Sequence, residues 1–116
     1  MSESTGTPSS EQQYRDRRSV PRFNFIASVD LTEPASDMRI AGRISEISRK
    51  GCYVDILNTL PVGTLLHLRI TRDQGSFSSK GKIIYVHEAM GMGVGFVDVA
   101  EEQLKILDSW LAELAG

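Results

Sequence analysis

The sequence has one cysteine and no long apolar run among its 116 residues. A lone Cys52 excludes an internal disulfide and a zinc site built from a cysteine cluster, and it fits a reducing compartment. The apolar runs fall far short of the roughly 18 residues that a membrane span needs, and the N-terminus lacks the apolar stretch of a signal peptide. These absences predict a cytoplasmic protein without membrane insertion.

Strong net charge is also lacking, because the chain carries only −2. That value argues against a protein that coats nucleic acid. Aromatic residues interleaved with basic ones along a strand, which stacking on single strands would need, are missing too. Positive charge is nevertheless concentrated between Tyr14 and Arg22, where four arginines stand against the single acid Asp16. A small anionic molecule is the natural partner for this segment.

The first 13 residues are rich in Ser, Thr, Gly and Glu and contain no large apolar residue after Met1. Such a segment cannot bury enough apolar surface to order itself, so we expect a disordered tail at 1–13. The remaining residues 14–116 suffice for one domain with one core. We divide them into an arginine-rich arm at 14–22, a barrel at 23–99 and a helix at 100–115.

Apolar residues alternate with polar ones from Arg22 onward, which is the pattern of a half-buried strand. The same period recurs in five further segments, separated by turn-forming residues. Six short strands without an intervening helix predict an all-β fold, a closed or nearly closed six-stranded antiparallel β-barrel, because closure removes exposed edges. The expected strands are about 23–31, 38–47, 51–57, 64–71, 77–87 and 93–99.

The last segment has a different period. Four leucines between Leu104 and Leu114 recur at helical spacing, which predicts a C-terminal α-helix that packs on the barrel. Asp98 and Glu101 have the spacing of a capping box at its start. The leucine stripe should face the core, and the flank with Ile106 or Trp110 is a candidate surface for a partner.

Three features that suggest other chemistry are interpreted as structural. The glycines of GMGVG at 91–95 have no βαβ unit around them, so they do not form a dinucleotide-binding loop. His67 and His87 lack a cysteine or carboxylate at the spacing of metal ligands, so no metal site is expected. Cys52 occupies an alternating apolar position and is expected in the core, and a Cys/His nucleophile pair has no support.

Two short motifs lie near the expected strands. RRSVPR at Arg17–Arg22 has the form RRxxxR immediately before the first strand. EISRKG at Glu46–Gly51 has the form [D/N]xSxxG with Glu in the first place. With these motifs, the strand pattern and the closing helix, the chain from about Tyr14 to Leu114 resembles the PilZ domain.

The resemblance implies a non-enzymatic receptor whose ligand is cyclic di-GMP and which needs no cofactor. Arginine suits this ligand, because a guanidinium can donate two hydrogen bonds to guanine O6 and N7 or pair with phosphate. A carboxylate can accept both N1–H and N2–H, a role that the family's Asp or Asn fills and that Glu46 would take. Ser48 would bind the ligand or fix the turn, and Gly51 would supply positive φ or room for the ligand. The implied ligand-binding residues are Arg17, Arg18, Arg22, Glu46, Ser48 and Gly51.

Glu46 departs from the family motif by one methylene. If the turn does not adjust, the loss of a good pair of hydrogen bonds costs on the order of 1–3 kcal/mol. Two functions therefore stay open. The protein is either a module that orders its arginine-rich arm around cyclic di-GMP and signals to a downstream protein, or an adaptor of the same kind that has lost the nucleotide and acts by protein contact.

Overall fold

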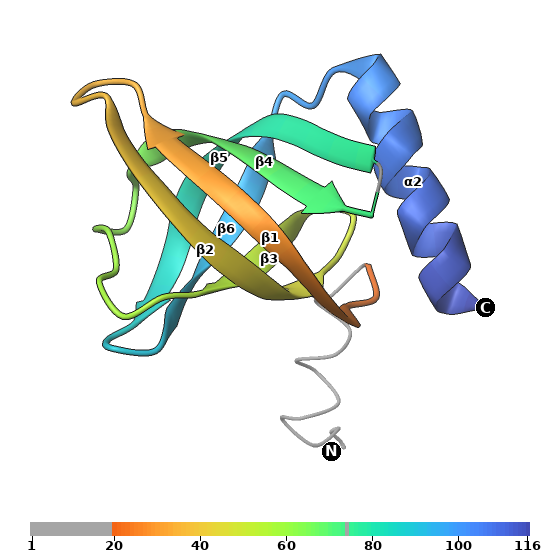
Figure 1. The fold of residues 1–116 in the computed structure, drawn as a ribbon, viewed down its shortest axis with the longest axis horizontal. Helices are drawn as coiled ribbons and strands as arrows, with labels where there is room; N and C mark the ends of the chain where they lie inside the picture. The colour runs from red at the N-terminus through yellow and green to blue at the C-terminus, as the bar shows by residue number, and fades with distance from the viewer. Residues whose placement is uncertain (1–19, 74) are drawn as a thin grey trace, which may run out of the picture.

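A computed structural model of the chain describes residues 20–73 and 75–116 (Figure 1). The tail expected at 1–13, and Arg17 and Arg18 of the first motif, lie outside these residues. The described part consists of six strands and one helix: β1 (Phe23–Glu33), β2 (Met38–Ile47), β3 (Gly51–Asp55), β4 (Leu65–Arg72), β5 (Gly75–His87), β6 (Gly91–Val97) and α2 (Glu101–Ala115).

The six strands form one closed antiparallel barrel in the order β1-β2-β3-β6-β5-β4. The chain leaves β3 and crosses the end of the barrel through residues 56–64, so that β4 starts beside β1 and β5. Strand β6 then returns to pair with β3. Each strand has a partner on both sides, so the barrel predicted from the alternating pattern is confirmed, and its backbone groups are satisfied by closure.

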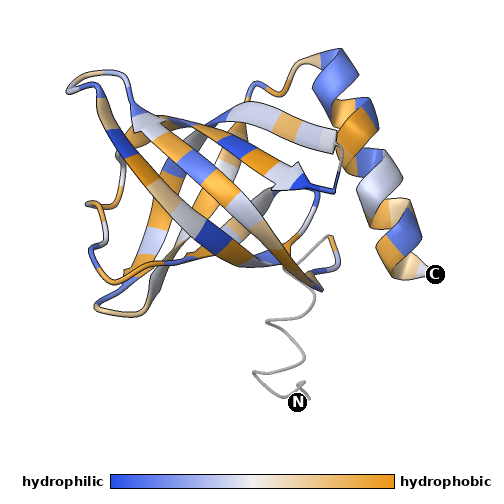
Figure 2. Ribbon diagram, viewed as in Figure 1, coloured by the Kyte–Doolittle hydropathy of each residue, from blue (hydrophilic) through white to orange (hydrophobic). Residues whose placement is uncertain are grey.

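The core fills the inside of the barrel because, away from the β-bulges described below, every second residue of a strand points inward. In β1, alternate residues from Phe25 to Leu31 are buried, and β4 follows the same pattern from Leu66 to Ile70. Figure 2 shows this as alternating apolar and polar bands along the strands. Cys52 is buried as expected. The largest fully buried side chains include Phe77, Leu31, Ile44, Ile47, Leu66, Ile70, Ile83, Met92 and Leu107.

Helix α2 packs beside one end of the barrel (Figure 1). Leu107 is fully buried, and Trp110 is only 8% exposed. The Trp110 ring lies 5.6 Å from the ring of Phe25 and 6.4 Å from that of Phe77. The expectation that the Trp110 flank is available to a partner is therefore wrong: the indole is an anchor that holds α2 on the barrel. Ile106 packs against the same core.

The capping box expected at the start of the helix is also wrong. Ala100 is the N-cap residue, and no side chain caps the helix there. Asp98 instead adopts a positive φ of 50°, which turns the chain between β6 and α2 and takes its side chain away from the capping position. Glu101 and Glu102 still lie in the first turn, where negative charge interacts favourably with the helix dipole.

Several strand ends differ from the expected ones by about two residues. β1 continues to Glu33 because Thr32 and Glu33 pair with the start of β2, which leaves only residues 34–37 for the turn. β6 begins at Gly91, since the glycines of GMGVG belong to the strand itself. In the described part of the chain, no helix combines the length and the apolar character of a membrane span.

Replacement of Trp110 tests the anchoring of α2. Trp110→Ala should lower the free energy of unfolding by about 3–5 kcal/mol, because it removes a large buried ring and leaves a cavity against Phe25 and Phe77. Ser109→Ala, at the exposed neighbouring position, should change it by less than about 0.5 kcal/mol. Urea unfolding followed by circular dichroism measures both values. Equally small effects of the two substitutions would contradict the role of Trp110 in holding α2 on the barrel.

Candidate ligand-binding site

A cavity of about 210 Å³ opens where the end of β2, the turn into β3, and strands β5 and β6 meet. Four of the six residues implied by the motifs line it: Arg22, Glu46, Ser48 and Gly51. The other two, Arg17 and Arg18, lie outside the described residues. Small-molecule sites usually enclose roughly 300–1,000 Å³, so this cavity accounts for only part of a dinucleotide site.

The turn between β2 and β3 is fixed by Ser48. Its Oγ accepts hydrogen bonds from the backbone N–H groups of Lys50 at 3.1 Å and Gly51 at 3.2 Å. The N–H of Ser48 donates to the carbonyl oxygen of Gly51 at 2.8 Å. Ser48 is buried, and its hydroxyl satisfies backbone donors that the tight turn leaves without strand partners. Of the two roles expected for Ser48, this geometry shows that of fixing the turn.

Gly51 is required by the approach of two backbones. Its φ is not positive; in the described residues, positive φ at glycine occurs at Gly63 and Gly116. A Cβ added at Gly51 would instead collide with the carbonyl oxygen of Val94 on β6. Of the two reasons expected for Gly51, the positive φ is wrong, and room for a ligand stays a prediction; the close neighbour in the structure is the adjacent strand.

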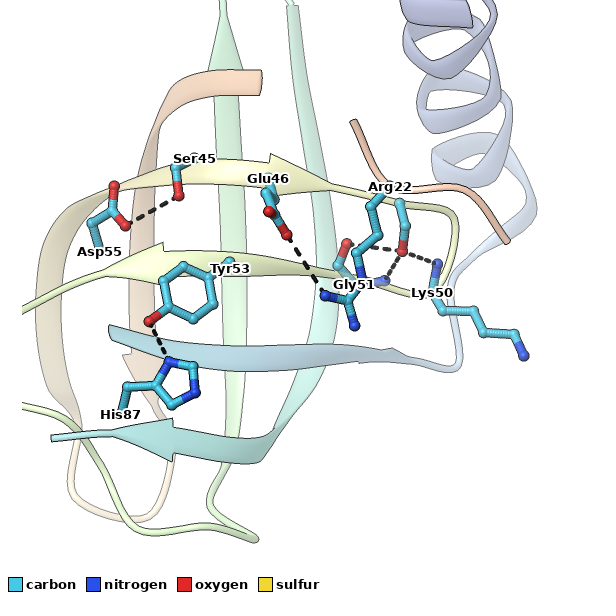
Figure 3. Close-up of polar contacts among 9 residues, drawn as sticks. Arg22, Ser45, Glu46, Lys50, Gly51, Tyr53, Asp55 and His87 are labelled. Atoms are coloured by element: carbon cyan, nitrogen blue, oxygen red, sulfur yellow. Dashed lines mark hydrogen bonds and ion pairs between the residues drawn. The ribbon is translucent and has the colours of Figure 1, made fainter. Parts of the chain in front are cut away.

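Arg22 and Glu46 face each other at the mouth of the cavity, as Figure 3 shows. Arg22 directly precedes β1, and Glu46 pairs with Asn24 near the end of β2, so the antiparallel register brings them to the same end of the barrel. The Arg22 Nη1 and Glu46 Oε1 atoms are 3.8 Å apart, with the two side chains 38% and 43% exposed. An ion pair this exposed contributes only about 0–1 kcal/mol, so a ligand can displace it at low cost.

Two β-bulges turn side chains toward this cavity. The pairing of β2 with β3 shifts between Ile44 and Glu46, and that of β5 with β6 shifts between Ile83 and Tyr85. Each bulge places two consecutive residues on the outer face of the barrel. Glu46 and Tyr85 owe their outward direction to these shifts, and both line the cavity.

An aromatic cluster forms a wall beside the cavity, and the motifs gave no indication of it. The rings of Tyr53, Tyr85 and His87 lie 5.3 to 6.2 Å apart, and the Tyr53 hydroxyl is 3.0 Å from His87 Nδ1 (Figure 3). The rings cover Gly91 and Gly93, where an added Cβ would meet a tyrosine ring. The alternate glycines in β6 were the sequence signal that large side chains of neighbouring strands lie over this strand.

The surroundings of Tyr53 keep its phenol protonated. Loss of hydration raises the pKa of Tyr53, and the nearby Tyr85, Asp55 and Glu46 raise it further by charge repulsion. The wall of the cavity is therefore uncharged at Tyr53 near neutral pH.

Nucleophile and metal chemistry find no support in the described residues. Burial raises the pKa of Cys52 from its ordinary 9.0 to about 12, so this thiol is protonated and poorly nucleophilic at neutral pH. No group of three or more His, Cys, Asp and Glu residues within 20–73 and 75–116 is arranged to hold a metal ion.

Comparison with known proteins connects this geometry to a family. The family model described as PilZ domain matches residues 16–113. No curated protein matches the sequence.

Solved structures share the fold at low sequence identity. The PilZ domain of YcgR from Escherichia coli, solved with c-di-GMP, has a TM-score of 0.72 at 16% identity, and the match covers 85% of this chain and 92% of that one. The inhibitor of motility MotI/DgrA from Bacillus subtilis has a TM-score of 0.71 at 16% identity, over 84% of this chain and 50% of that one. The PilZ domain of CeSA from a cellulose-synthesizing bacterium has a TM-score of 0.64 at 16% identity, and the match covers 83% of this chain and 99% of that one. This chain thus spans two PilZ domains almost completely, but only half the length of MotI/DgrA.

Substitution of Gly51 tests the approach of β3 to β6. Gly51→Ala should lower the free energy of unfolding by at least about 2 kcal/mol, because the backbone of Val94 cannot give way to a Cβ without breaking the strand pairing. Gly42→Ala is the matched control in β2, where a Cβ would meet its nearest atoms at an ordinary 3.8 Å. Chemical denaturation of both variants measures the difference, and a harmless Gly51→Ala would refute the constraint.

Proposed function

The chain belongs to the PilZ domain family, and on that premise we propose that it is a receptor for cyclic di-GMP, a ligand-binding module and not an enzyme. One observation carries the proposal: Arg22, Glu46 and the Ser48–Gly51 turn, drawn from two separate motifs, line one cavity at the end of the barrel. The PilZ domain of YcgR, which has the same fold, was solved with c-di-GMP. The proposal places the protein in the cytoplasm, in keeping with its single unpaired cysteine.

Glu46 is suited to the donor edge of a guanine. Its carboxylate is partly exposed and can accept N1–H and N2–H together. On ligand binding, the Arg22 guanidinium would exchange its weak ion pair with Glu46 for charge-assisted hydrogen bonds to guanine O6 and N7 or to a phosphate. The hydrogen bonds of Ser48 fix the backbone of the turn between Glu46 and Gly51, so these two residues are held in place before a ligand binds.

Arg17 and Arg18 would close the site from the other side. Arg17 precedes Arg22 by five residues, and a fully extended chain spans at most about 3.3–3.6 Å per residue, so its Cα stays within roughly 18 Å of Arg22. That reach is enough to fold the arm at 14–22 over a ligand lying in the cavity. The arm would lose conformational freedom on binding, and a partner protein could sense the ordered arm as the output.

The alternative function is a PilZ adaptor that acts by protein contact without the nucleotide. It is favoured by the same pair, since Arg22 and Glu46 neutralise each other without a ligand and Glu46 is longer than the Asp or Asn of the motif. The two functions differ in their response to the nucleotide alone.

Calorimetric titration with cyclic di-GMP separates them. The full chain should bind the ligand, and neither GTP nor cyclic di-AMP should reproduce its affinity. Arg22→Ala and Arg18→Ala should each weaken binding by about 30-fold, since a hydrogen bond to a charged group contributes about 2 kcal/mol. Arg39→Ala, on the far part of β2, should leave the affinity unchanged. No heat of binding at several hundred micromolar ligand from the folded chain would contradict the receptor and leave the adaptor.

Paired substitutions of Glu46 test its role at the guanine edge. Glu46→Gln replaces one acceptor oxygen by an NH₂ donor that opposes the guanine donors, so affinity should fall by about ten-fold or more. Glu46→Asp keeps both oxygens and restores the residue of the motif, so it should bind at least as tightly as the natural chain. If Glu46→Gln binds with natural affinity, the carboxylate does not take the proposed position.

A further inference from the structure

A second cavity of about 730 Å³ is lined by residues of β1, β2, β4 and β5, among them the core residues Leu31 and Leu68. Four basic residues from three of these strands line it, and we call it the basic groove: Arg39, His67, Arg69 and Lys80. One rim is formed by Asp98 and Ala100, just before α2. The groove shares no lining residue with the candidate ligand-binding site.

The strand register sets the basic side chains in rows. Thr32 of β1 pairs with Arg39 on one side and with His67 on the other, and His67 pairs with Lys80. These four residues therefore cross the outer face as one row, and neighbouring strands are about 4.8 Å apart. Arg39 and Lys80 are then separated by roughly 14 Å. Arg69 adds a cation two residues farther along β4, beside Asp30.

The charges of the groove are unpaired in the described part of the chain. No acid there lies within ion-pair distance of Arg39, Arg69 or Lys80, and all three side chains are exposed. The other arginines among residues 20–73 and 75–116 behave differently, because each has an acid within 4.0 Å: Arg22, Arg43, Arg49 and Arg72. Arg39, Arg69 and Lys80 outnumber the two acids that line the groove, Asp30 and Asp98, so the charge of the groove is positive on balance.

We propose that the basic groove is a docking surface for a carboxylate-rich segment of a partner protein. Carboxylates would form charge-assisted hydrogen bonds with the two guanidinium groups and the Lys80 ammonium. In an extended segment, alternate side chains repeat every 6.6–6.8 Å or so, which is also the spacing of His67 and Arg69 along β4. Acidic residues at alternate positions of such a segment match the spacing of these two basic side chains.

The surroundings favour a protein segment over a nucleic acid. No Phe, Tyr or Trp side chain lines the groove, so unstacked bases have no large aromatic ring to stack on there. The N–H of Ser78 donates to Gln103 Oε1 at 2.8 Å, which fixes the start of α2 beside β5 at the edge of the groove.

Docking here is compatible with an occupied ligand site. Arg39 and Glu46 lie on the same strand seven residues apart, which corresponds to roughly 23 Å. The partner and the nucleotide therefore need not compete for space. The inference does not depend on the proposed function, because it rests on the charge and register of a different face.

Fluorescence anisotropy with a defined peptide tests the groove. A fluorescein-labelled peptide of five Glu-Ser repeats should bind the full chain at about 50 mM salt with micromolar affinity and lose affinity as salt screens the contact. Arg69→Ala and Lys80→Ala should each raise the Kd about five-fold. Lys105→Ala removes an exposed cation of α2 outside the groove and should change it less than two-fold. A peptide of five Gln-Ser repeats should not bind.

Three results would overturn the inference. The first is no change of anisotropy up to about 1 mM protein. The second is an equal loss of affinity in Lys105→Ala and Arg69→Ala, which would assign binding to overall charge. The third is tighter binding of a ten-nucleotide single strand than of the acidic peptide, abolished by Arg69→Ala, which would make the groove a nucleic-acid site. Thermal unfolding of each variant verifies that the barrel is intact, and the cyclic di-GMP titration is unaffected by any of these results.

Discussion

The contact of the β3 backbone at Gly51 with the β6 backbone at Val94 is the constraint on which the site depends. It leaves no room for a side chain at Gly51, and it is reinforced by the hydrogen bond from the N–H of Phe96 to the carbonyl oxygen of Lys50 at 2.8 Å. The turn before Gly51 is thereby held against β6 on one side and by the Ser48 hydroxyl on the other. A rigid turn gives Glu46 a fixed base at the cavity mouth, which favours a preorganised contact with a ligand.

The barrel was predictable from the sequence because one face of almost every strand is buried, and a strand with one buried face shows apolar residues at every second position. The candidate site residues came from the two motifs, and the antiparallel register of β1 and β2 brings Arg22 to Glu46. The bulges were harder to foresee, since a bulge inserts one residue into an otherwise regular alternation. Only the β2 bulge has a local sign in the sequence: Ile44 and Ile47 are both apolar and buried although two residues separate them, where regular alternation would leave one.

Other features depended on tertiary contacts that no local pattern records. Trp110 lies on the flank of the helical stripe, and only the neighbouring rings of Phe25 and Phe77 decide that it is buried. Asp98 had the right spacing for a cap, but its positive φ belongs to the turn that carries the chain from β6 to α2. The basic groove arises from three strands that are distant in sequence, so its charges are adjacent only in the closed barrel.

In the proposed function, cyclic di-GMP binds between the arginine-rich arm and the Glu46–Gly51 turn. Amide NMR of the ¹⁵N-labelled full chain during titration with this nucleotide tests this binding mode residue by residue. We expect saturable shifts at Arg22, at Glu46 and through the Ser48–Gly51 turn, together with new, slowly exchanging signals from the arm, while the residues of the basic groove stay unshifted. Saturable shifts elsewhere on the barrel with none at this turn, or no shifts at all, would contradict it.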